Sequence, residues 1–389
     1  MPRPPRTSIS PDHVQRFLME LFQNDLHAAR VKSLANGVSG VLHSASLGVS
    51  AIGRGLAAAR GLVDKHAIKQ TDRLLTNPAI EVAQLAAVWV RSVLEGWEGP
   101  VFVNLDWTEF DSDDQSMLVL AMQGDGRSVP LMWKTVVKSD LKGKRNDHED
   151  DLLNEFHAAV PEGVEVVVVA DRGFCDQQFL TFLTTELEFD YIIRIRKDIT
   201  VTSAKGDQRQ AGDWVTASGR LRRLVRATVT LGHTTVGQFV AVHDKAMKEP
   251  WLLVCSRGGW TGTEIKKRYG RRFTCEETFR DIKDLRFGMG MSWGKVTKPD
   301  RRDRMMLLAT LAHTLLTELG AAGEDAGLDR LLKSNTSKRR TLSQFRQGCR
   351  WYELIPSMPA PRLRKLMNAF TKRILRHPVF SLLISVPAK

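Results

Sequence analysis

Three acidic residues lie directly after apolar runs or within a highly charged stretch of the sequence. Asp106 follows the apolar run VFVNL, Asp171 follows the valines of VEVVVVA, and Glu276 lies in the charged stretch YGRRFTCEETFRDIK, residues 269–283. Both aspartates end expected strands, and the strand ends of a mixed sheet share a crevice. Converging carboxylates repel one another unless a cation lies between them, and Mg²⁺ or Mn²⁺ prefers oxygen ligands. The predicted chemistry is phosphodiester displacement, with two ions about 3.5–4 Å apart stabilising the attacking and leaving oxygens.

These carboxylates also have ordinary structural explanations. An Asp at the end of a strand often caps a helix or forms a turn. Other carboxylates compete for the same role, namely Glu109, Asp111, Asp113, Asp114 and the acidic run 148–151. Composition alone does not choose between these groups.

Helical geometry separates Glu276 from its neighbours. If residues 263–285 form one helix, about 100° per residue places Tyr269, Arg272, Glu276 and Lys283 within about 60° of one another. That face offers a carboxylate for metal and cations for phosphate. A solvated surface helix with i,i+3 and i,i+4 ion pairs is an equally valid interpretation of the spacing alone. Glu277 falls off this face.

The surrounding patterns predict the elements that position the three carboxylates. Residues 1–98 place apolar side chains at helical spacing, and we interpret them as a helical DNA-binding region. From residue 99 the sequence pattern becomes typical of strands, and helical patterns alternate with them from residue 148. The expected strands span 101–107, 117–123, 129–137, 164–171 and 190–196, and the expected helices span 148–160 and 175–187.

The second half of the chain divides into three further parts. Residues 197–257 hold short β-type runs between turn residues, which indicates a β-rich insertion. Residues 258–320 return to helical spacing and complete the catalytic domain begun at 99–196. Residues 321–389 form a basic helical C-terminal region. The predicted fold class is therefore α/β, a mixed sheet flanked by helices with a β-rich insertion.

The spacing of four residues resembles a known signature. Tyr269, Arg272, Glu276 and Lys283 fit Y-x2-R-x3-E-x6-K, which is similar to the signature of bacterial insertion-sequence transposases of the DDE type, insertion-sequence family four. LDWT at 105–108 resembles the first catalytic block of that family, and ADRGF at 170–174 resembles the second. The resemblance extends over about residues 100–320.

The resemblance implies a fold and a set of roles. The fold is ribonuclease-H-like, and Asp106, Asp171 and Glu276 are the metal-binding catalytic residues, with two Mg²⁺ or Mn²⁺ ions per site. It implies that Tyr269, Arg272 and Lys283 contact the phosphates of the transposon end. The reaction is cleavage of double-stranded DNA at the element ends followed by strand transfer into target DNA. The nucleophile is then water or a 3′-hydroxyl, so no catalytic Ser, Cys or His is required.

Some members of this family form a hairpin that requires a flipped base. Trp260 is a candidate to receive such a base, and packing in the core is an equally good explanation for it.

The bulk charge agrees with a nucleic-acid partner. The chain carries 57 Lys and Arg against 44 Asp and Glu, a net charge of +13. Eight Lys or Arg fall within 266–286, including Arg271 and Arg280, and further basic clusters lie at 219–226, 337–350 and 361–377. Spread over several segments, these charges fit a long duplex path, although each cluster alone could be a solvated face.

Location and assembly follow more indirectly. Four scattered cysteines without zinc spacing indicate a reducing compartment. With no signal peptide expected and the apolar run 305–320 interpreted as a buried helix, we expect a cytoplasmic, nucleoid-associated bacterial protein without membrane contact. Cutting two ends together implies a homodimer in a synaptic complex. Two alternatives remain open: a structure-selective nuclease on the same fold, and a catalytically inactive DNA-binding regulator.

Overall fold

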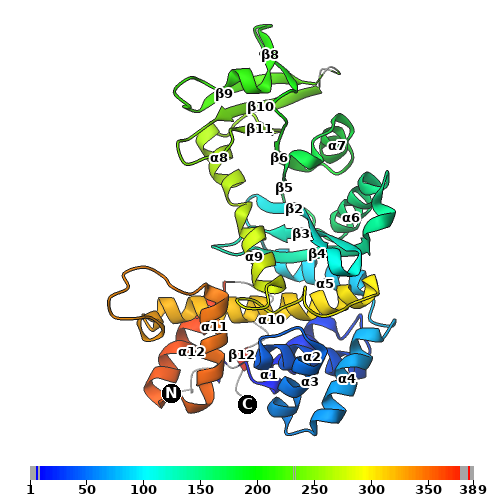
Figure 1. The fold of residues 1–389 in the computed structure, drawn as a ribbon, viewed down its shortest axis with the longest axis vertical. Coiled ribbons are helices and arrows are strands. Elements are labelled where there is room, and N and C mark those ends of the chain that lie inside the picture. The colour runs from blue at the N-terminus through cyan, green and yellow to red at the C-terminus, as the bar shows by residue number, and fades with distance from the viewer. Residues whose placement is uncertain (1–5, 8, 231, 233, 377–383, 386–389) are drawn as a thin grey trace.

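A computed structural model describes residues 6–7, 9–230, 232, 234–376 and 384–385. Figure 1 shows helical layers at one end, a sheet in the middle and the strands of the insertion at the other end. The long helix α10 (Pro299–Asp325) crosses between the N-terminal helices and the sheet. Residues 1–5, 8, 377–383 and 386–389 of the predicted terminal regions lie outside the described residues.

The N-terminal region is helical, as predicted. Its helices are α1 (Pro11–Phe22), α2 (Ala28–Ser44), α3 (Val49–Arg60), α4 (Asp64–Thr76) and α5 (Val82–Leu94). Helices α2 and α3 pack closely because glycines face each other, and a Cβ on Gly55 would collide with the carbonyl oxygen of Gly40. Helix α5 packs on the sheet, where Trp89 Nε1 donates to the carbonyl of Pro130 over 3.0 Å.

The central sheet has the predicted ribonuclease-H-like arrangement. Its strands are β2 (Val101–Phe110), β3 (Gln115–Met122), β4 (Val129–Val137), β5 (Val166–Ala170) and β6 (Asp190–Arg194). They lie in the order β4-β3-β2-β5-β6, with antiparallel pairs on one side and the parallel pairs β2–β5 and β5–β6 on the other. Helix α6 (Arg145–Ala159) leads into β5, and α7 (Gln177–Thr181), continued by a π turn at Phe182–Glu186, leads into β6.

The β-rich insertion continues this sheet. Strands β7 (Thr200–Thr202), β8 (Gln208–Gln210), β9 (Arg222–Val229), β10 (Thr234–Val242) and β11 (Trp251–Cys255) extend it in the order β6-β11-β10-β9-β7-β8. The junction is the antiparallel pairing of β11 with β6, where Val254 faces Ile193. The insertion is therefore attached through main-chain hydrogen bonds to the strand that neighbours β5.

The expected single helix over 263–285 is wrong, because the structure has two helices. A capping box of Thr261 and Glu264 starts α8 (Gly262–Gly270), and α9 (Phe273–Lys283) follows. Between them the hydrogen bonds tighten to i,i+3, from Arg272 N to the Tyr269 carbonyl and from Cys275 N to the Arg272 carbonyl, both 2.9 Å. Because of this turn, the side chains of α8 and α9 do not follow the single helix on which the predicted common face depends.

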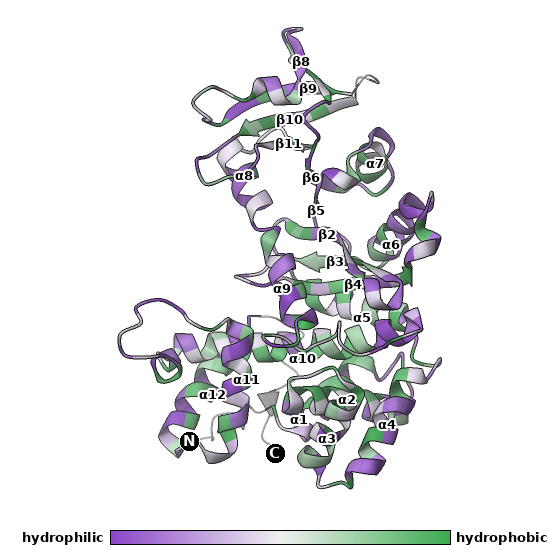
Figure 2. Ribbon diagram, viewed as in Figure 1, coloured by the Kyte–Doolittle hydropathy of each residue, from purple (hydrophilic) through white to green (hydrophobic). Residues whose placement is uncertain are grey.

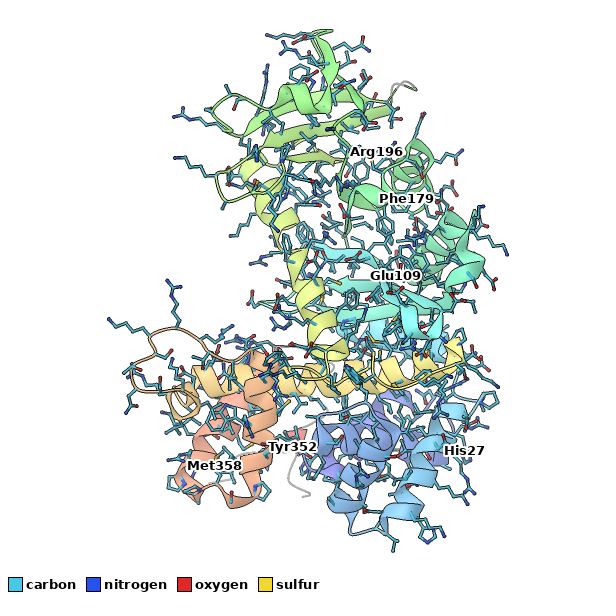
Figure 3. All side chains as sticks on the ribbon, in the orientation of Figure 1. His27, Glu109, Phe179, Arg196, Tyr352 and Met358 are labelled. Carbon is cyan, nitrogen blue, oxygen red and sulfur yellow. The ribbon has the colours of Figure 1, made fainter. Side chains whose placement is uncertain are left out.

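The C-terminal half packs around α10. This helix is apolar and long enough to cross a membrane by length and composition, but 89% of its most apolar window is buried inside the protein. The predicted burial of 305–320 is therefore confirmed, and Figure 2 shows hydrophobic residues along α10, α5 and the central strands. Helices α11 (Gln344–Leu354) and α12 (Ala360–Ile374) pack against it. Tyr352, labelled in Figure 3, ties α11 to α2 through a 2.9 Å hydrogen bond to His43.

The remaining elements are short. Strands β1 (Arg6–Thr7) and β12 (Ile384–Ser385) form an antiparallel pair. The 3-10 turns lie at Asp111–Asp113, Lys138–Leu141, Arg172–Phe174, Ala211–Trp214, Asp329–Leu332 and Ile355–Ser357.

Candidate active site

Asp106 and Asp171 lie side by side because of strand register. Strands β2 and β5 are parallel, and their last paired residues are Leu105 and Ala170, so the two aspartates occupy the next position on each strand. Alternation along β2 places Asp106 on the same face as Phe102, and that face packs against α8. Asp171 also accepts a hydrogen bond from Arg172 N over 2.6 Å, so the ordinary capping role is present as well.

Glu276 approaches the two aspartates from the first turn of α9. Cys275 and Ile282 of this helix are buried, which orients the opposite side of the helix toward the strand ends. The side chain of Glu276 is 46% exposed. Asp106, Asp171 and Glu276 line one open cavity of about 670 Å³. The structure therefore brings together the three predicted carboxylates, although they are far apart in the sequence.

Arg272 connects two of these carboxylates. Its Nη1 lies 2.9 Å from Asp106 Oδ2, and its Nη2 lies 2.8 Å from Glu276 Oε1. The Arg272 side chain is only 11% exposed. Burial alone would lower the pKa of Arg272, but the neighbouring carboxylates raise it above its ordinary value. Arg272 is therefore a permanent cation at the centre of the acidic cluster.

The pKa of Asp106 reflects its burial and its charged neighbours. Burial raises the pKa of Asp106 to about 6, while Arg272 opposes the rise and the charges of Glu276 and Asp171 add to it. The raised pKa therefore comes mainly from burial, and the Arg272 guanidinium offsets only part of it.

The three carboxylates suit the predicted divalent cation by their chemistry, but their geometry does not form a ready metal site. Carboxylate oxygens are the ligands that Mg²⁺ and Mn²⁺ prefer, and a cation would favour the charged form of Asp106, which burial disfavours. Among the described residues, however, no three His, Cys, Asp or Glu side chains stand close enough to form a ready metal-binding group. Arg272 lies between two of the three candidates. Metal binding at this cavity stays a prediction.

The predicted phosphate contacts differ in their environments. Lys283 lines the cavity, but its Nζ also donates to Thr108 Oγ1 (2.9 Å) and to the carbonyl of Glu109 (2.6 Å). This lysine therefore anchors α9 to β2. Glu109 itself, labelled in Figure 3, lies at the end of β2. Arg280 lines the same cavity and pairs with Glu277.

Tyr269 does not present its ring to solvent. The side chain is 3% exposed and packs edge-on against Trp251, with ring centroids 5.0 Å apart. Burial raises the pKa of its phenol to about 12, and the nearby Arg272 guanidinium opposes the rise. The phenol of Tyr269 therefore lies near Arg272 inside the protein. This buried position does not provide the direct DNA contact that was expected of Tyr269.

Trp260 and Arg271 lie outside the cavity that the carboxylates line. Trp260 is half-buried and packs on Phe102, with ring centroids 5.5 Å apart. The guanidinium carbon of Arg257 lies over the Trp260 ring, 5.0 Å from its centroid. These contacts favour packing in the protein core as the role of Trp260. Arg271 lines a separate cavity.

Sequence reasoning missed several cavity residues. Trp107 follows Asp106 and is fixed by a 2.7 Å hydrogen bond from its Nε1 to Glu149. Trp293 is 72% exposed at the rim. Main-chain hydrogen bonds from Met289 and Met291 back to α9 hold the segment before Trp293 against that helix. Its position within the Gly-rich stretch GMGMSWG was the only available signal.

Comparison with known proteins agrees with the geometry. Residues 132–315 match the family described as "Transposase DDE domain". The matched segment contains Asp171 and Glu276 but begins after Asp106, which the register of β2 and β5 places beside them. No curated protein matches the chain. The match covers a little under half of the chain and supports a DDE transposase.

Proposed function

We propose that this DDE transposase belongs to insertion-sequence family four and moves its element by cut-and-paste transposition. The observation that carries the proposal is that Asp106, Asp171 and Glu276 line one cavity together with Arg272 and Lys283. The Y-x2-R-x3-E-x6-K spacing supports the family. In this account the chain cleaves DNA at the element ends and joins the freed 3′-hydroxyl to a target.

The three carboxylates would hold the divalent ions of this reaction, Mg²⁺ or Mn²⁺, with two ions per active site. When bound, the ions supply Lewis-acid stabilisation of the phosphodiester oxygens and lower the pKa of the attacking water. The chain's own residues supply position. Arg272 fixes Asp106 and Glu276 relative to each other, Tyr269 braces Arg272, and Lys283 holds α9 on β2.

The DNA path is supported by arginines of the insertion. Arg220, Arg223 and Arg226 are exposed near the start of β9 and along it. Arg222 stacks on Trp214, with its guanidinium carbon 4.7 Å from the ring centroid. We propose that the insertion, the N-terminal helices (1–98) and the basic C-terminal helices (321–389) contact duplex DNA around the catalytic domain (99–196 and 258–320). Such a path suits a homodimer that pairs two ends, in the cytoplasm and associated with the nucleoid.

An end-joining assay tests the proposal. A plasmid carrying the DNA that flanks the gene is incubated with the protein, a target plasmid and Mg²⁺. Excision of the flanked segment and its covalent joining to the target is the expected result. Nicking without joining would favour a structure-selective nuclease. Binding without any cleavage in Mg²⁺ or Mn²⁺ would favour an inactive regulator and contradict the proposal.

A further inference from the structure

A buried arginine outside the carboxylate cavity joins two of the segments that border it. Arg302, in the first turn of α10, has no exposed surface, although arginine side chains normally reach solvent. Its Nη2 forms an ion pair with Asp113, whose side chain is 3% exposed, and its Nε donates to Gln115 Oε1 over 2.5 Å. Asp113 lies in the turn that joins β2 to β3, and Gln115 starts β3. Arg302 therefore ties α10 to the end of the strand that carries Asp106.

The same two partners hold residues 292–296, the rim segment, which precedes α10. The amide of Val296 donates to Asp113 Oδ2 over 3.1 Å, and the Val296 carbonyl accepts from Gln115 Nε2 over 2.8 Å. Two residues of the rim segment line the carboxylate cavity. Arg302 binds the same carboxylate oxygen and the same amide group that hold Val296. The position of the rim segment therefore depends on Arg302 through both of its anchors.

A second connection runs from Arg302 through an aromatic ring to the cavity. The guanidinium carbon of Arg302 lies 3.8 Å from the ring centroid of Phe110, and Lys283 Nζ lies 4.7 Å from the same centroid. Phe110 is buried, and the attraction of a cation to an aromatic face is stronger where water is excluded. Arg302 also contributes to lowering the pKa of Lys283, after the larger effect of burial. Arg302 thus acts on a lysine that lines the carboxylate cavity without lining that cavity itself.

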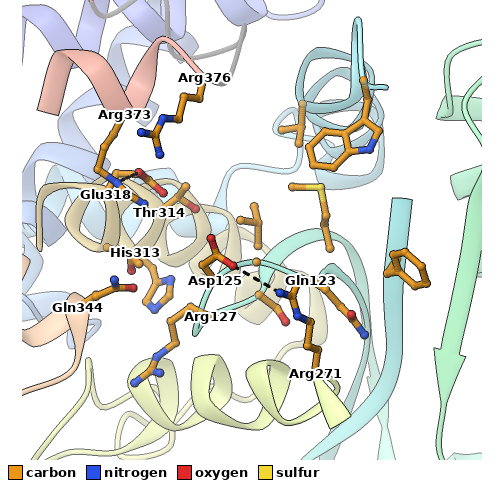
Figure 4. Close-up of a pocket in the computed structure, with 18 of the residues that line it drawn as sticks. Gln123, Asp125, Arg127, Arg271, His313, Thr314, Glu318, Gln344, Arg373 and Arg376 are labelled. Atoms are coloured by element: carbon orange, nitrogen blue, oxygen red, sulfur yellow. Dashed lines mark hydrogen bonds and ion pairs between the residues drawn. The ribbon is translucent and has the colours of Figure 1, made fainter. Parts of the chain in front are cut away.

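The body of α9 has an anchor of its own. Asp281 accepts a hydrogen bond from Arg127 Nε over 2.5 Å, and His313 Nε2 lies 3.3 Å from the same carboxylate. Arg127 and His313, both labelled in Figure 4, belong to the β3–β4 turn and to α10. Glu276 lies five residues before Asp281 on the same helix, so this network holds it independently of Arg302. The contacts of Arg302 bear instead on the last residue of α9 and on the rim segment.

Stability alone is a weak reason for this buried ion pair. Taking two charges out of water is costly, and apolar side chains of similar volume often stabilise a buried position as well. The Nη1 atom of Arg302 is buried and has no hydrogen-bond partner among the described residues, so part of that cost is not offset. What the arginine adds is a rigid planar group that reaches a carboxylate, an amide and an aromatic ring at once. Its contacts therefore favour a role in positioning.

We propose that Arg302 is a positioning residue for DNA cleavage, which fixes Lys283 through Phe110 and fixes the rim segment through Asp113 and Gln115. This inference rests on the proposed function, because it assigns Arg302 to the same cleavage site. Arg302 touches no reacting group, and the surfaces that contact the duplex elsewhere do not include it. Its loss therefore lowers the maximal rate of cleavage and leaves the half-saturating concentration of DNA almost unchanged.

Nicking of a supercoiled plasmid that carries the element ends, measured over a range of DNA concentrations, tests this role in the full-length protein. Arg302→Met should lower the maximal rate about tenfold and change the half-saturating DNA concentration less than about twofold, because a misplaced group disturbs the reacting geometry. Arg302→Lys keeps the charge but loses the planar fork, and should recover part of the rate. Arg304→Met is the matched control. Arg304 is also buried on α10, but it donates to the carbonyls of Ile80 and Leu75, away from the cavity.

Limited proteolysis reports on the rim segment without any DNA. Trypsin cleaves after Lys295, which is exposed and directly precedes the anchored Val296. In Arg302→Met this cleavage should be at least about fivefold faster than in the wild type, because the rim segment loses the support of both anchors. Arg304→Met should stay within about twofold. Circular dichroism checks that each variant folds.

Phe110→Leu keeps the buried ion pair and so provides a second variant if Arg302→Met does not fold. It breaks only the connection to Lys283, so nicking should slow about threefold or more while cleavage after Lys295 stays at the wild-type rate. Wild-type nicking by folded Arg302→Met or by Phe110→Leu, or equal losses in Arg302→Met and Arg304→Met, would overturn the inference. Unchanged tryptic cleavage of Arg302→Met also contradicts it, whereas a wild-type protein that nicks no DNA contradicts the proposed function.

Discussion

Arg272 donates a hydrogen bond from Nη1 to Oδ2 of Asp106 over 2.9 Å, and this contact joins the start of α9 to the middle of β2. The same guanidinium holds Glu276 at 2.8 Å. The relative position of two catalytic candidates therefore depends on one side chain.

Arg272→Ala should lower the rate of Mg²⁺-dependent plasmid nicking about 10²-fold. The variant loses both hydrogen bonds that orient the carboxylates, and removal of one oriented charged donor from an active site typically has this effect. Arg350→Ala is the matched control, because Arg350 is exposed on α11 and, among the residues that the structure describes, its ion pair is with Glu353. A nicking rate for Arg272→Ala close to that of Arg350→Ala would show that the bridge has no role in catalysis.

Lys283→Ala should destabilise the fold as well as reduce activity. Its ammonium makes two hydrogen bonds to β2, so we expect the free energy of unfolding in urea to fall by about 1–3 kcal/mol. Lys295→Ala, at an exposed position outside the cavity, should change it by less than about 0.5 kcal/mol. If Lys283 only contacts DNA, the two variants will unfold at the same urea concentration.

Two substitutions at Tyr269 separate packing from hydrogen bonding. Tyr269→Ala removes a buried ring and should lower the free energy of unfolding by about 3–5 kcal/mol. Tyr269→Phe keeps the ring and loses only the hydroxyl, so about 1 kcal/mol is expected. A direct phosphate contact predicts the opposite pattern, with normal unfolding of both variants and equally weakened DNA binding.

Stability should depend on pH through Asp303. Burial raises the pKa of this carboxyl to about 7, against hydrogen bonds from Thr135 that lower it. A raised folded-state pKa means that its stabilisation is complete below the unfolded-state pKa and is lost as pH rises through 7. Asp303→Asn should therefore be more stable than the wild type at pH 8, by about 2 kcal/mol, and the difference should shrink below pH 5. Urea unfolding at both pH values measures it, and a difference independent of pH would contradict the assignment.

The sequence predicted most of the frame that holds the site. Strand patterns located β2 to β6 within a few residues, and the run of valines before Asp171 correctly indicated a strand buried on both faces. The prediction that Asp106 ends its strand is wrong, because β2 continues to Phe110 through its antiparallel pairing with β3.

What the sequence left open depends on contacts between distant segments. The spacing of Tyr269 and Arg272 fits one continuous helix, and only hydrogen bonding at the α8–α9 junction shows the turn that buries the tyrosine against Trp251. The commitment of Lys283 to β2 depends on residues more than 170 positions away. Trp293 carries no pattern of its own, because its exposure is set by hydrogen bonds from the preceding segment to α9.

The central claim is that Glu276 completes a catalytic cluster with Asp106 and Asp171. Nicking of a supercoiled plasmid carrying the element ends, measured in Mg²⁺, tests it through two neighbouring and chemically identical substitutions. Glu276→Gln removes a carboxylate from the cavity, whereas Glu277→Gln removes one that pairs with Arg280 and does not line it. The account predicts loss of nicking by at least about 10³-fold for Glu276→Gln and less than about threefold for Glu277→Gln. Equal activity of the two variants would contradict it.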